Sequence, residues 1–128
     1  IINLFLKNKL ANAYLYKKLL KETPGINLLT EKPYTKSNFW MFTVILDKKL
    51  NRDIVAKNLK LLGIDTRVAF YPLSDLPPYK HASEAEDGTL EISRDLAYRS
   101  LTLPSSSKLT TKDIEYICSS LKSMLVTK

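Results

Sequence analysis

Apolar positions recur along this chain with two different periods, which predicts helices separated by short strands. Residues 1–22 read as a helix whose apolar side chains fall on two neighbouring stripes. The first stripe holds Ile2, Leu6, Leu10, Ala13 and Leu20, and the second holds Ile1, Phe5, Tyr16 and Leu19. So wide an apolar surface predicts contact with two partners, one of them outside this chain. We expect the helix to end at Thr23, Pro24 and Gly25.

Four short runs predict strands. Residues 39–46 are almost uninterrupted apolar and rich in β-forming side chains, the pattern of a central strand covered on both faces. Residues 26–29 read as an edge strand. Residues 66–70 read as a strand that ends at Pro72, because proline cannot continue a central ladder. Residues 101–103 read as a further strand that stops at Pro104.

Capping residues mark two more helices. Asn51 suits the N-cap of a helix that carries Val55, Leu59 and Leu62 on one face, and Gly63 suits the C′ position after it. Thr110 suits the N-cap of the last helix, with Asp113 as its partner in a capping box. The apolar stripe of that last helix is Ile114, Ile117, Leu121 and Leu125. Between them, residues 81–89 read as a mobile acidic loop and residues 90–99 as a short helix.

This alternation predicts the α/β (α+β) class, as a two-layer sandwich with a small, mostly antiparallel sheet covered by helices on one side. The length of 128 residues predicts a single domain over residues 1–128. The chain begins on Ile1, inside an apolar run and without a methionine. We therefore expect it to be part of a larger protein.

Charge, cysteine content and the length of the apolar runs indicate what kind of surface the protein has and in which compartment it acts. The net charge is +7, but the lysines are spread in singles and doublets, which is typical of a solvated surface. The lone cysteine, Cys118, falls on the apolar stripe of the last helix and is expected in the core. The apolar run over residues 1–6 is too short for a signal-peptide core, and no segment approaches the length of a membrane span. We therefore expect a cytoplasmic protein without a membrane partner.

Most catalytic arrangements are missing. His81 and Cys118 are the only histidine and cysteine, and they stand in unrelated contexts, so neither a metal site nor a Ser-His-Asp triad is expected. Glu84, Glu86 and Asp87 belong to the acidic loop, where solvated charge is the simpler reading. The three glycines are isolated, which excludes a glycine-rich phosphate loop.

The segment over residues 63–79 carries the remaining candidate chemistry. The planar fork of Arg67 suits a phosphate or a carboxylate, and Tyr71 and Tyr79 offer rings and hydroxyls. Ser74 and Asp75 lie in the turn before Pro77 and Pro78. One interpretation is a wall of a pocket for a phosphate-bearing ligand. The other is structural: Phe70 in the core, Arg67 on the surface or paired with Asp65 or Asp75, and Ser74 or Asp75 capping a short helix.

An ordered series of motifs resembles a known family. It consists of Phe39-Trp40-Met41-Phe42, Arg52-Asp53, Gly63-Ile64-Asp65-Thr66-Arg67, Tyr71-Pro72-Leu73, Pro77-Pro78-Tyr79, Leu101-Thr102-Leu103-Pro104-Ser105 and Leu109-Thr110. The series resembles the C-terminal domain of DegT/StrS sugar-nucleotide aminotransferases, and within them GDP-perosamine synthases. One departure is Ser74, where many relatives carry histidine.

The resemblance implies the small domain of a type I aminotransferase that depends on pyridoxal phosphate, with residues 1–22 as an interdomain helix and residues 23–128 as the sandwich. It implies glutamate as amino donor, a nucleotide-linked 4-keto-6-deoxy sugar as acceptor, and a homodimer. It also implies that the cofactor and the catalytic lysine belong to a large N-terminal domain outside this chain. Arg67, Tyr71, Ser74 and Tyr79 are the substrate-binding candidates.

Two other classes stay open. A basic nucleic-acid-binding module predicts basic and aromatic residues on one sheet face, although the apolar run 39–46 argues against it and no nucleic-acid partner is expected. A non-catalytic dimerisation or regulatory module explains the missing machinery equally well.

Overall fold

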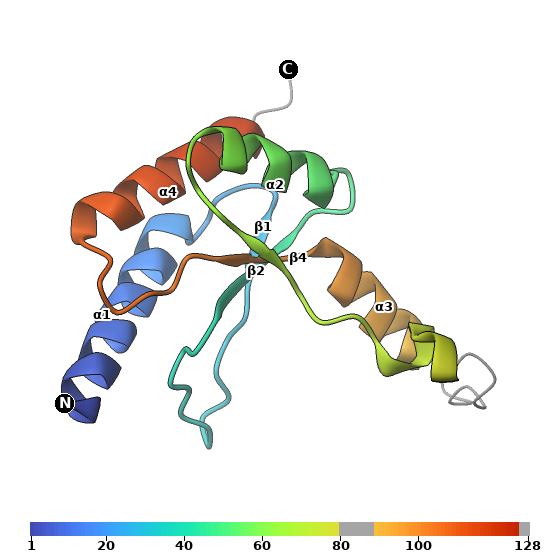
Figure 1. Cartoon of the computed structure of the whole chain (residues 1–128), viewed down its shortest axis with the longest axis horizontal. Coiled ribbons are helices and arrows are strands. Elements are labelled where there is room, and N and C mark those ends of the chain that lie inside the picture. Colours follow the sequence, from blue (N-terminus) through green and yellow to red (C-terminus); the bar gives the residue numbers. More distant parts are fainter. Residues whose placement is uncertain (80–88, 126–128) are drawn as a thin grey trace.

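The fold consists of helices around a small sheet, in a computed structural model that describes residues 1–79 and 89–125 (Figure 1). The helices over those residues are α1 (Ile2–Leu20), α2 (Arg52–Leu61), α3 (Thr89–Arg99) and α4 (Thr111–Leu125). The strands are β1 (Ile26–Leu28), β2 (Phe42–Leu46), β3 (Arg67–Val68) and β4 (Ser100–Leu103), and two 3-10 turns are η1 (Leu73–Asp75) and η2 (Pro77–Tyr79). The predicted acidic loop lies outside the described residues except for Thr89. No described helix combines the length and apolarity needed to cross a membrane.

The four strands form one antiparallel sheet in the order β1-β2-β4-β3. Side chains alternate between its faces, so Phe42 and Val44 of β2 share one face with Leu103 and Leu101 of β4, their partners in the register. On the other face Thr43 lies opposite Thr102, with their hydroxyl oxygens 2.9 Å apart. The predicted edge strand is confirmed as β1, and the two-layer fold class is confirmed.

The core lies between one face of the sheet and helices α1, α2 and α4. The ring of Tyr16 stacks on Phe42 with ring centroids 4.7 Å apart, while Leu59 and Leu121 are completely buried. Cys118 lies in this core as predicted, and burial raises the pKa of its thiol to about 11. Of the apolar stripes that the sequence pattern indicated, the helices bury Val55 and Leu59 of α2 and Ile114, Ile117 and Leu121 of α4.

The predicted caps are confirmed. The side chain of Asn51 accepts from the N–H groups of Asp53 and Ile54. Gly63 has φ +77°, its N–H donates to the carbonyl of Lys60, and the next N–H, of Ile64, donates to the carbonyl of Leu59. This pair of bonds is a Schellman motif, which needs a left-handed residue at Gly63.

The last helix begins at the predicted capping box. The Thr110 hydroxyl accepts from the N–H of Asp113, and the Asp113 carboxylate accepts from the N–H and the hydroxyl of Thr110. Those bonds hold the pKa of Asp113 below its usual range. The helix start is thus set by residues within one turn, as the sequence indicated.

Three expectations were wrong in detail. The strand expected over residues 39–46 begins only at Phe42, because Phe39 has φ +47° and leaves the extended conformation. The strand expected over residues 66–70 shortens to Arg67–Val68, since only these two residues pair with β4, opposite Thr102 and Leu101. Leu62 is exposed because the helix ends at Leu61, one residue before it.

The N-terminal half of α1 projects beyond the sheet. Only Ala13, Tyr16 and Leu20 of its apolar residues are buried, whereas Ile2 is 79% exposed and Leu6 39%. Trp40, which is 67% exposed, lines a hollow together with Ile2 and Leu6 at this end of the helix. Of the two expected apolar stripes, the chain itself covers only the C-terminal part.

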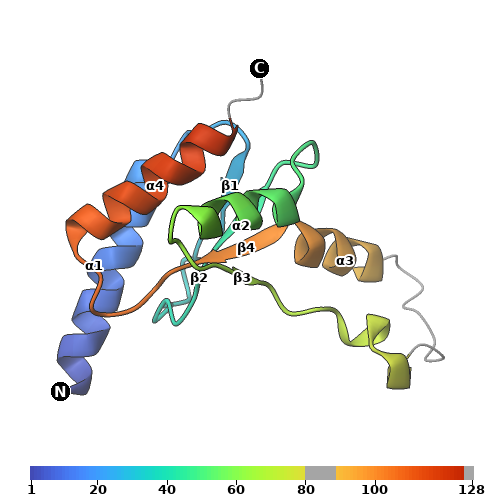
Figure 2. The ribbon, with the colours of Figure 1, turned by 45° about the horizontal axis from the view of Figure 1, so that its top comes forward.

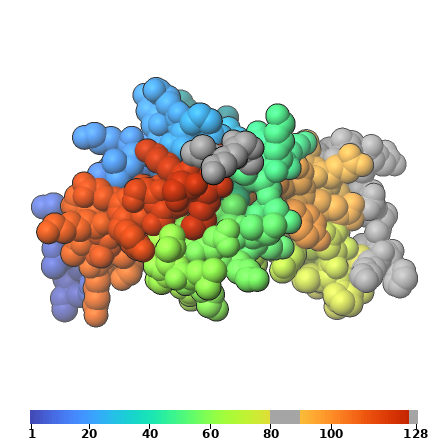
Figure 3. Space-filling view, turned by 90° about the horizontal axis from the view of Figure 1, so that it is seen from above, coloured from blue at the N-terminus to red at the C-terminus, as the bar shows by residue number. Residues whose placement is uncertain are grey.

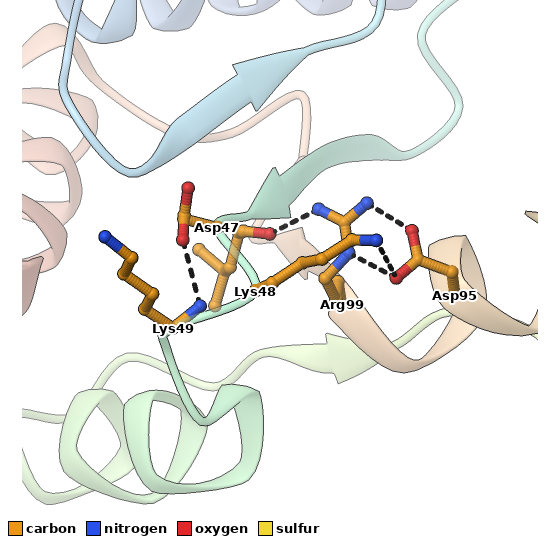
Figure 4. A network of polar contacts seen from close by, with 6 residues as sticks. Asp47, Lys48, Lys49, Asp95 and Arg99 are labelled. Carbon is orange, nitrogen blue, oxygen red and sulfur yellow. Dashed lines mark hydrogen bonds and ion pairs between the residues drawn. The ribbon is translucent and has the colours of Figure 1, made fainter.

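Residues 69–79 and α3 form an arm that leaves the sheet on the side away from α1 and α4 (Figures 1 and 2). In the space-filling view the arm lies at one end of the molecule, opposite the N-terminal end of α1 (Figure 3). Its root is tied by Arg99, whose Nη1 donates to the carbonyl of Leu46 at 2.7 Å and whose guanidinium pairs with Asp95 (Figure 4). Lys48 approaches the same carboxylate at 3.7 Å. The buried Arg52 adds a bond from Nη1 to the carbonyl of Ala97 at 2.9 Å.

Candidate functional site

Arg67 lies on the edge strand β3, directly opposite Thr102 of β4. Its side chain is exposed and forms no hydrogen bond or ion pair with the described part of the chain. It lines a hollow of about 310 Å³, together with Asp65, Thr102, Trp40, Met41 and the Leu103–Ser106 segment. The sequence left open that Arg67 pairs with Asp75, but that carboxylate is held by Arg94 instead. The guanidinium is therefore available to a ligand.

The turn after β4 is held from one side by α1. Four side chains of the helix donate to four successive carbonyls of the turn: Tyr16 to Pro104 at 2.9 Å, Lys9 to Ser105 at 2.7 Å, Asn12 to Ser106 at 3.1 Å and Asn8 to Ser107 at 3.4 Å. Lys9 also donates to the carbonyl of Trp40 at 3.0 Å, as does the Ser105 hydroxyl. These bonds fix the walls of the Arg67 hollow.

Tyr71 and Ser74 belong to a second cluster, on the arm. The Asp75 carboxylate accepts from Nε of Arg94 at 2.7 Å and from the hydroxyl of Tyr98 at 3.2 Å, with Ser74 at 3.5 Å. The bond from Arg94 is the main cause that lowers the pKa of Asp75, and the carboxylate in turn raises the pKa of Tyr98. Tyr71 packs edge-on against the Tyr98 ring, with centroids 6.1 Å apart.

The four predicted substrate residues do not converge in this chain. Arg67 lines the hollow beside the sheet, Tyr71 and Ser74 lie on the arm, and Tyr79 is half-exposed at the end of η2. Sequence reasoning missed Ser105 as part of the hollow. The signal was present, because Ser105 stands in one of the motifs that carried the family resemblance.

The described residues do not fit a pyridoxal phosphate site. Lys9 is the best candidate for the required amine, since burial lowers the pKa of its ammonium. However, that ammonium donates to two backbone carbonyls, so its amine is not presented to an incoming carbonyl group. Gly25 and Gly63 stand singly at turns and build no phosphate cradle. No described part of this chain is therefore assigned to the cofactor.

The second face of the sheet bears on the nucleic-acid alternative. The residues that share this face in the register are Asn27, Thr43, Ile45, Arg67, Ser100 and Thr102. No aromatic ring is among these strand residues, so the described face does not offer the stacking platform that such a module requires. The structure thus argues against that class.

Comparison with known sequences identifies relatives over most of the chain. The profile of the DegT/DnrJ/EryC1/StrS aminotransferase family matches residues 2–122. A GDP-perosamine synthase from Caulobacter vibrioides is 38% identical over 90 residues, which cover 69% of this chain and 24% of that protein. A dTDP-4-amino-4,6-dideoxy-D-glucose transaminase from Escherichia coli is 37% identical over 93 residues, 70% of this chain and 25% of that protein. The chain thus matches about a quarter of the length of these two relatives.

Solved structures agree in fold. DesV from S. venezuelae, in complex with a ketimine intermediate, superposes with a TM-score of 0.84 at 25% identity, over 96% of this chain and 32% of its own. A DegT DnrJ EryC1 StrS aminotransferase from Brucella abortus gives a TM-score of 0.82 over 95% of this chain and 31% of its own. At 24% identity the latter supports the fold alone.

Proposed function

The chain belongs to the DegT/DnrJ/EryC1/StrS aminotransferase family, and on that premise we propose that it is the C-terminal domain of a sugar-nucleotide aminotransferase. The reaction moves an amino group from glutamate to a nucleotide-linked 4-keto-6-deoxy sugar. The observation that carries the proposal is the family match over residues 2–122, with GDP-perosamine synthase among the relatives. The parent protein acts in the cytoplasm as a homodimer, as the family resemblance implies.

Pyridoxal phosphate, when bound by the parent, supplies the electron sink for amino transfer. The residues of this chain contribute substrate contacts and no catalytic lysine. We assign substrate binding to Arg67, Tyr71, Ser74 and Tyr79. The support is that Arg67 is exposed without an ion-pair partner in the described part of the chain, and that the Asp75 cluster holds Tyr71 and Ser74 in place.

The exposed end of α1 supports a place for this helix in an interdomain interface. Ile2, Phe5 and Leu6 form an apolar surface with Trp40 that the described residues leave open. In the parent, the large domain covers it. Without that domain, the 128-residue chain self-associates through this end of the helix. A chain that stays monomeric in sedimentation experiments at high concentration contradicts this placement.

The activity is tested on the parent protein, with glutamate as donor and GDP- and dTDP-linked 4-keto-6-deoxy hexoses as acceptors. The expected result is amino sugar and 2-oxoglutarate in equal amounts. The 128-residue chain alone is expected to be inactive and to form no stable adduct with pyridoxal phosphate. A borohydride-trappable adduct at one lysine of this chain, or a parent without amino transfer to any sugar nucleotide, refutes the proposal.

A further inference from the structure

The hollow beside Arg67 has the features of an anion site. Arg67 brings a guanidinium with no partner among the described residues, and the planar fork of arginine matches a phosphate group. Lys9 does not line the hollow but contacts one of its lining residues, with its ammonium 2.7 Å from the carbonyl oxygen of Ser105. The charged side chains on the lining are Arg67 and Asp65, and Lys9 adds a positive charge at the carbonyls of Ser105 and Trp40.

The serine turn adds neutral donors. Donors from α1 engage the carbonyls of residues 104–107, as described above. By contrast, the N–H groups of Ser105 and Ser106 donate to no acceptor in the described part of the chain. Both residues line the hollow. Successive unpaired N–H groups beside a cation are a recurring way of binding an anion.

The size of the hollow limits what it takes. Its volume of about 310 Å³ stands at the small end of the roughly 300–1,000 Å³ range of ligand pockets. It accommodates one part of a nucleotide sugar rather than the whole molecule. Among the parts of such a ligand, the diphosphate alone carries the negative charge that Arg67 and the turn complement.

We propose that this hollow is the subsite for the diphosphate of the nucleotide sugar, bound by Arg67 and the N–H groups of Ser105 and Ser106. The assignment rests on the proposed function for the identity of the ligand. The assignment gives the predicted site residues different roles. Arg67 binds the diphosphate, while Tyr71, Ser74 and Tyr79 on the arm face other parts of the substrate. It also makes Lys9 a positioning residue, since it holds both Trp40 and Ser105 in the walls.

The chain carries its own reporter for this site, because Trp40 is its only tryptophan and lines the hollow. The 128-residue chain is titrated with inorganic pyrophosphate at constant ionic strength, while tryptophan fluorescence and the amide signals of Ser105 and Ser106 in an NMR spectrum are followed. We expect a saturable fluorescence change and a shift of both amides. No saturable change overturns the proposal, and so does a chain that binds glutamate more tightly than pyrophosphate.

Charge variants test which groups bind. Arg67→Gln is expected to weaken pyrophosphate binding about tenfold or more, as loss of one charge-assisted contact implies. Asp65→Asn is expected to strengthen binding, because it removes the opposing charge. Lys57 lies on the exposed face of α2, outside the hollow. Lys57→Gln removes one positive charge, as Arg67→Gln does, and should leave pyrophosphate binding unchanged. Equal weakening by Arg67→Gln and Lys57→Gln overturns the site in favour of general attraction to a basic protein.

The parent protein separates this inference from the proposed function. If it transfers amino groups and Arg67→Gln leaves its KM for the sugar nucleotide unchanged, the subsite is wrong and the function stands. If pyrophosphate binds as expected but the parent transfers no amino group, the anion site stands and the function is wrong.

Discussion

Between α4 and the sheet, Ile114, Leu121 and Val44 are completely buried, whereas Ala97 is the one buried side chain of the arm over its described residues. The arm is instead held by polar contacts. Arg94 pairs with Asp75 within it, and at its root Arg99 donates to the carbonyl of Leu46 and Arg52 to that of Ala97. Burial of apolar area stabilises far more than partly exposed ion pairs. The core side therefore carries most of the stability of the domain, and the arm contributes less to it.

The largest effect is expected from shortening a core side chain. Leu121→Ala should lower the free energy of unfolding by about 2–5 kcal/mol, because it opens a cavity at a fully buried position. The matched change on the arm, Leu96→Ala, should cost less than about 1 kcal/mol, since Leu96 is already 37% exposed. Urea unfolding followed by circular dichroism measures both. Equal losses would contradict the contrast between core and arm.

The next largest effect is expected at the turn that closes α2. Gly63→Ala places a Cβ in open space, with no atom within 4 Å, but forces a left-handed conformation on alanine. The cost should be about 1–2 kcal/mol from the backbone alone. Asn58→Ala on the exposed face of α2 is the control and should change little. A neutral Gly63→Ala in the same unfolding experiment would show that the Schellman turn is not required.

A local effect is expected from Asp75→Asn, which weakens the tie between η1 and α3. The global midpoint of unfolding should move little, while amide exchange over residues 71–79 should accelerate. The same loosening should occur in acid. The pKa of Asp75 is lowered in the folded chain, so its contribution is complete above the ordinary value and is lost as the pH falls below about 4.

The control is Glu115→Gln. Glu115 lies on the exposed face of α4, far from the arm, and the change removes one carboxylate as Asp75→Asn does. It should leave amide exchange over residues 71–79 unchanged. If Asp75→Asn lowered the global midpoint as much as Leu121→Ala does, the arm would be part of the cooperative core.

The smallest effect is expected at Cys118. Burial raises the pKa of its thiol to about 11, so little thiolate forms near neutral pH. Iodoacetamide at pH 8 should modify Cys118 slowly in the folded chain and rapidly in urea, with mass spectrometry as readout. Equal rates in both conditions would show that the packing of α4 on the sheet opens easily.

Several features of the fold were predictable because neighbours in the chain decide them. Asn51, Gly63 and the pair Thr110–Asp113 act within one helical turn, and all three act as their residue types predict. The apolar run around Val44 also indicated a central strand from local pattern alone. The wrong strand ends, at Phe39 and at residues 69–70, lie where pairing with β4 stops, which local pattern does not encode.

The candidate site was predictable only in part. The residue types of the segment from Gly63 to Tyr79 pointed to Arg67, Tyr71, Ser74 and Tyr79, and their use as substrate contacts remains a prediction. Their separation into a hollow and an arm was not visible, because it depends on where the chain goes after β3. The donors of α1 to the serine turn were not visible either, since each bond joins residues about ninety positions apart.

The sequence by itself determined the helices, their caps, which run forms the central strand of the sheet and which an edge strand, and the family. These follow from side-chain periodicity and from contacts within a turn, which every segment carries with it. Only the tertiary structure decided that Lys9, Asn12 and Tyr16 hold the turn after β4, and that Ser105 and Arg67 line the same hollow. The reason is that hydrogen bonds between distant segments depend on the relative placement of α1 and the sheet, which packing of the whole core sets.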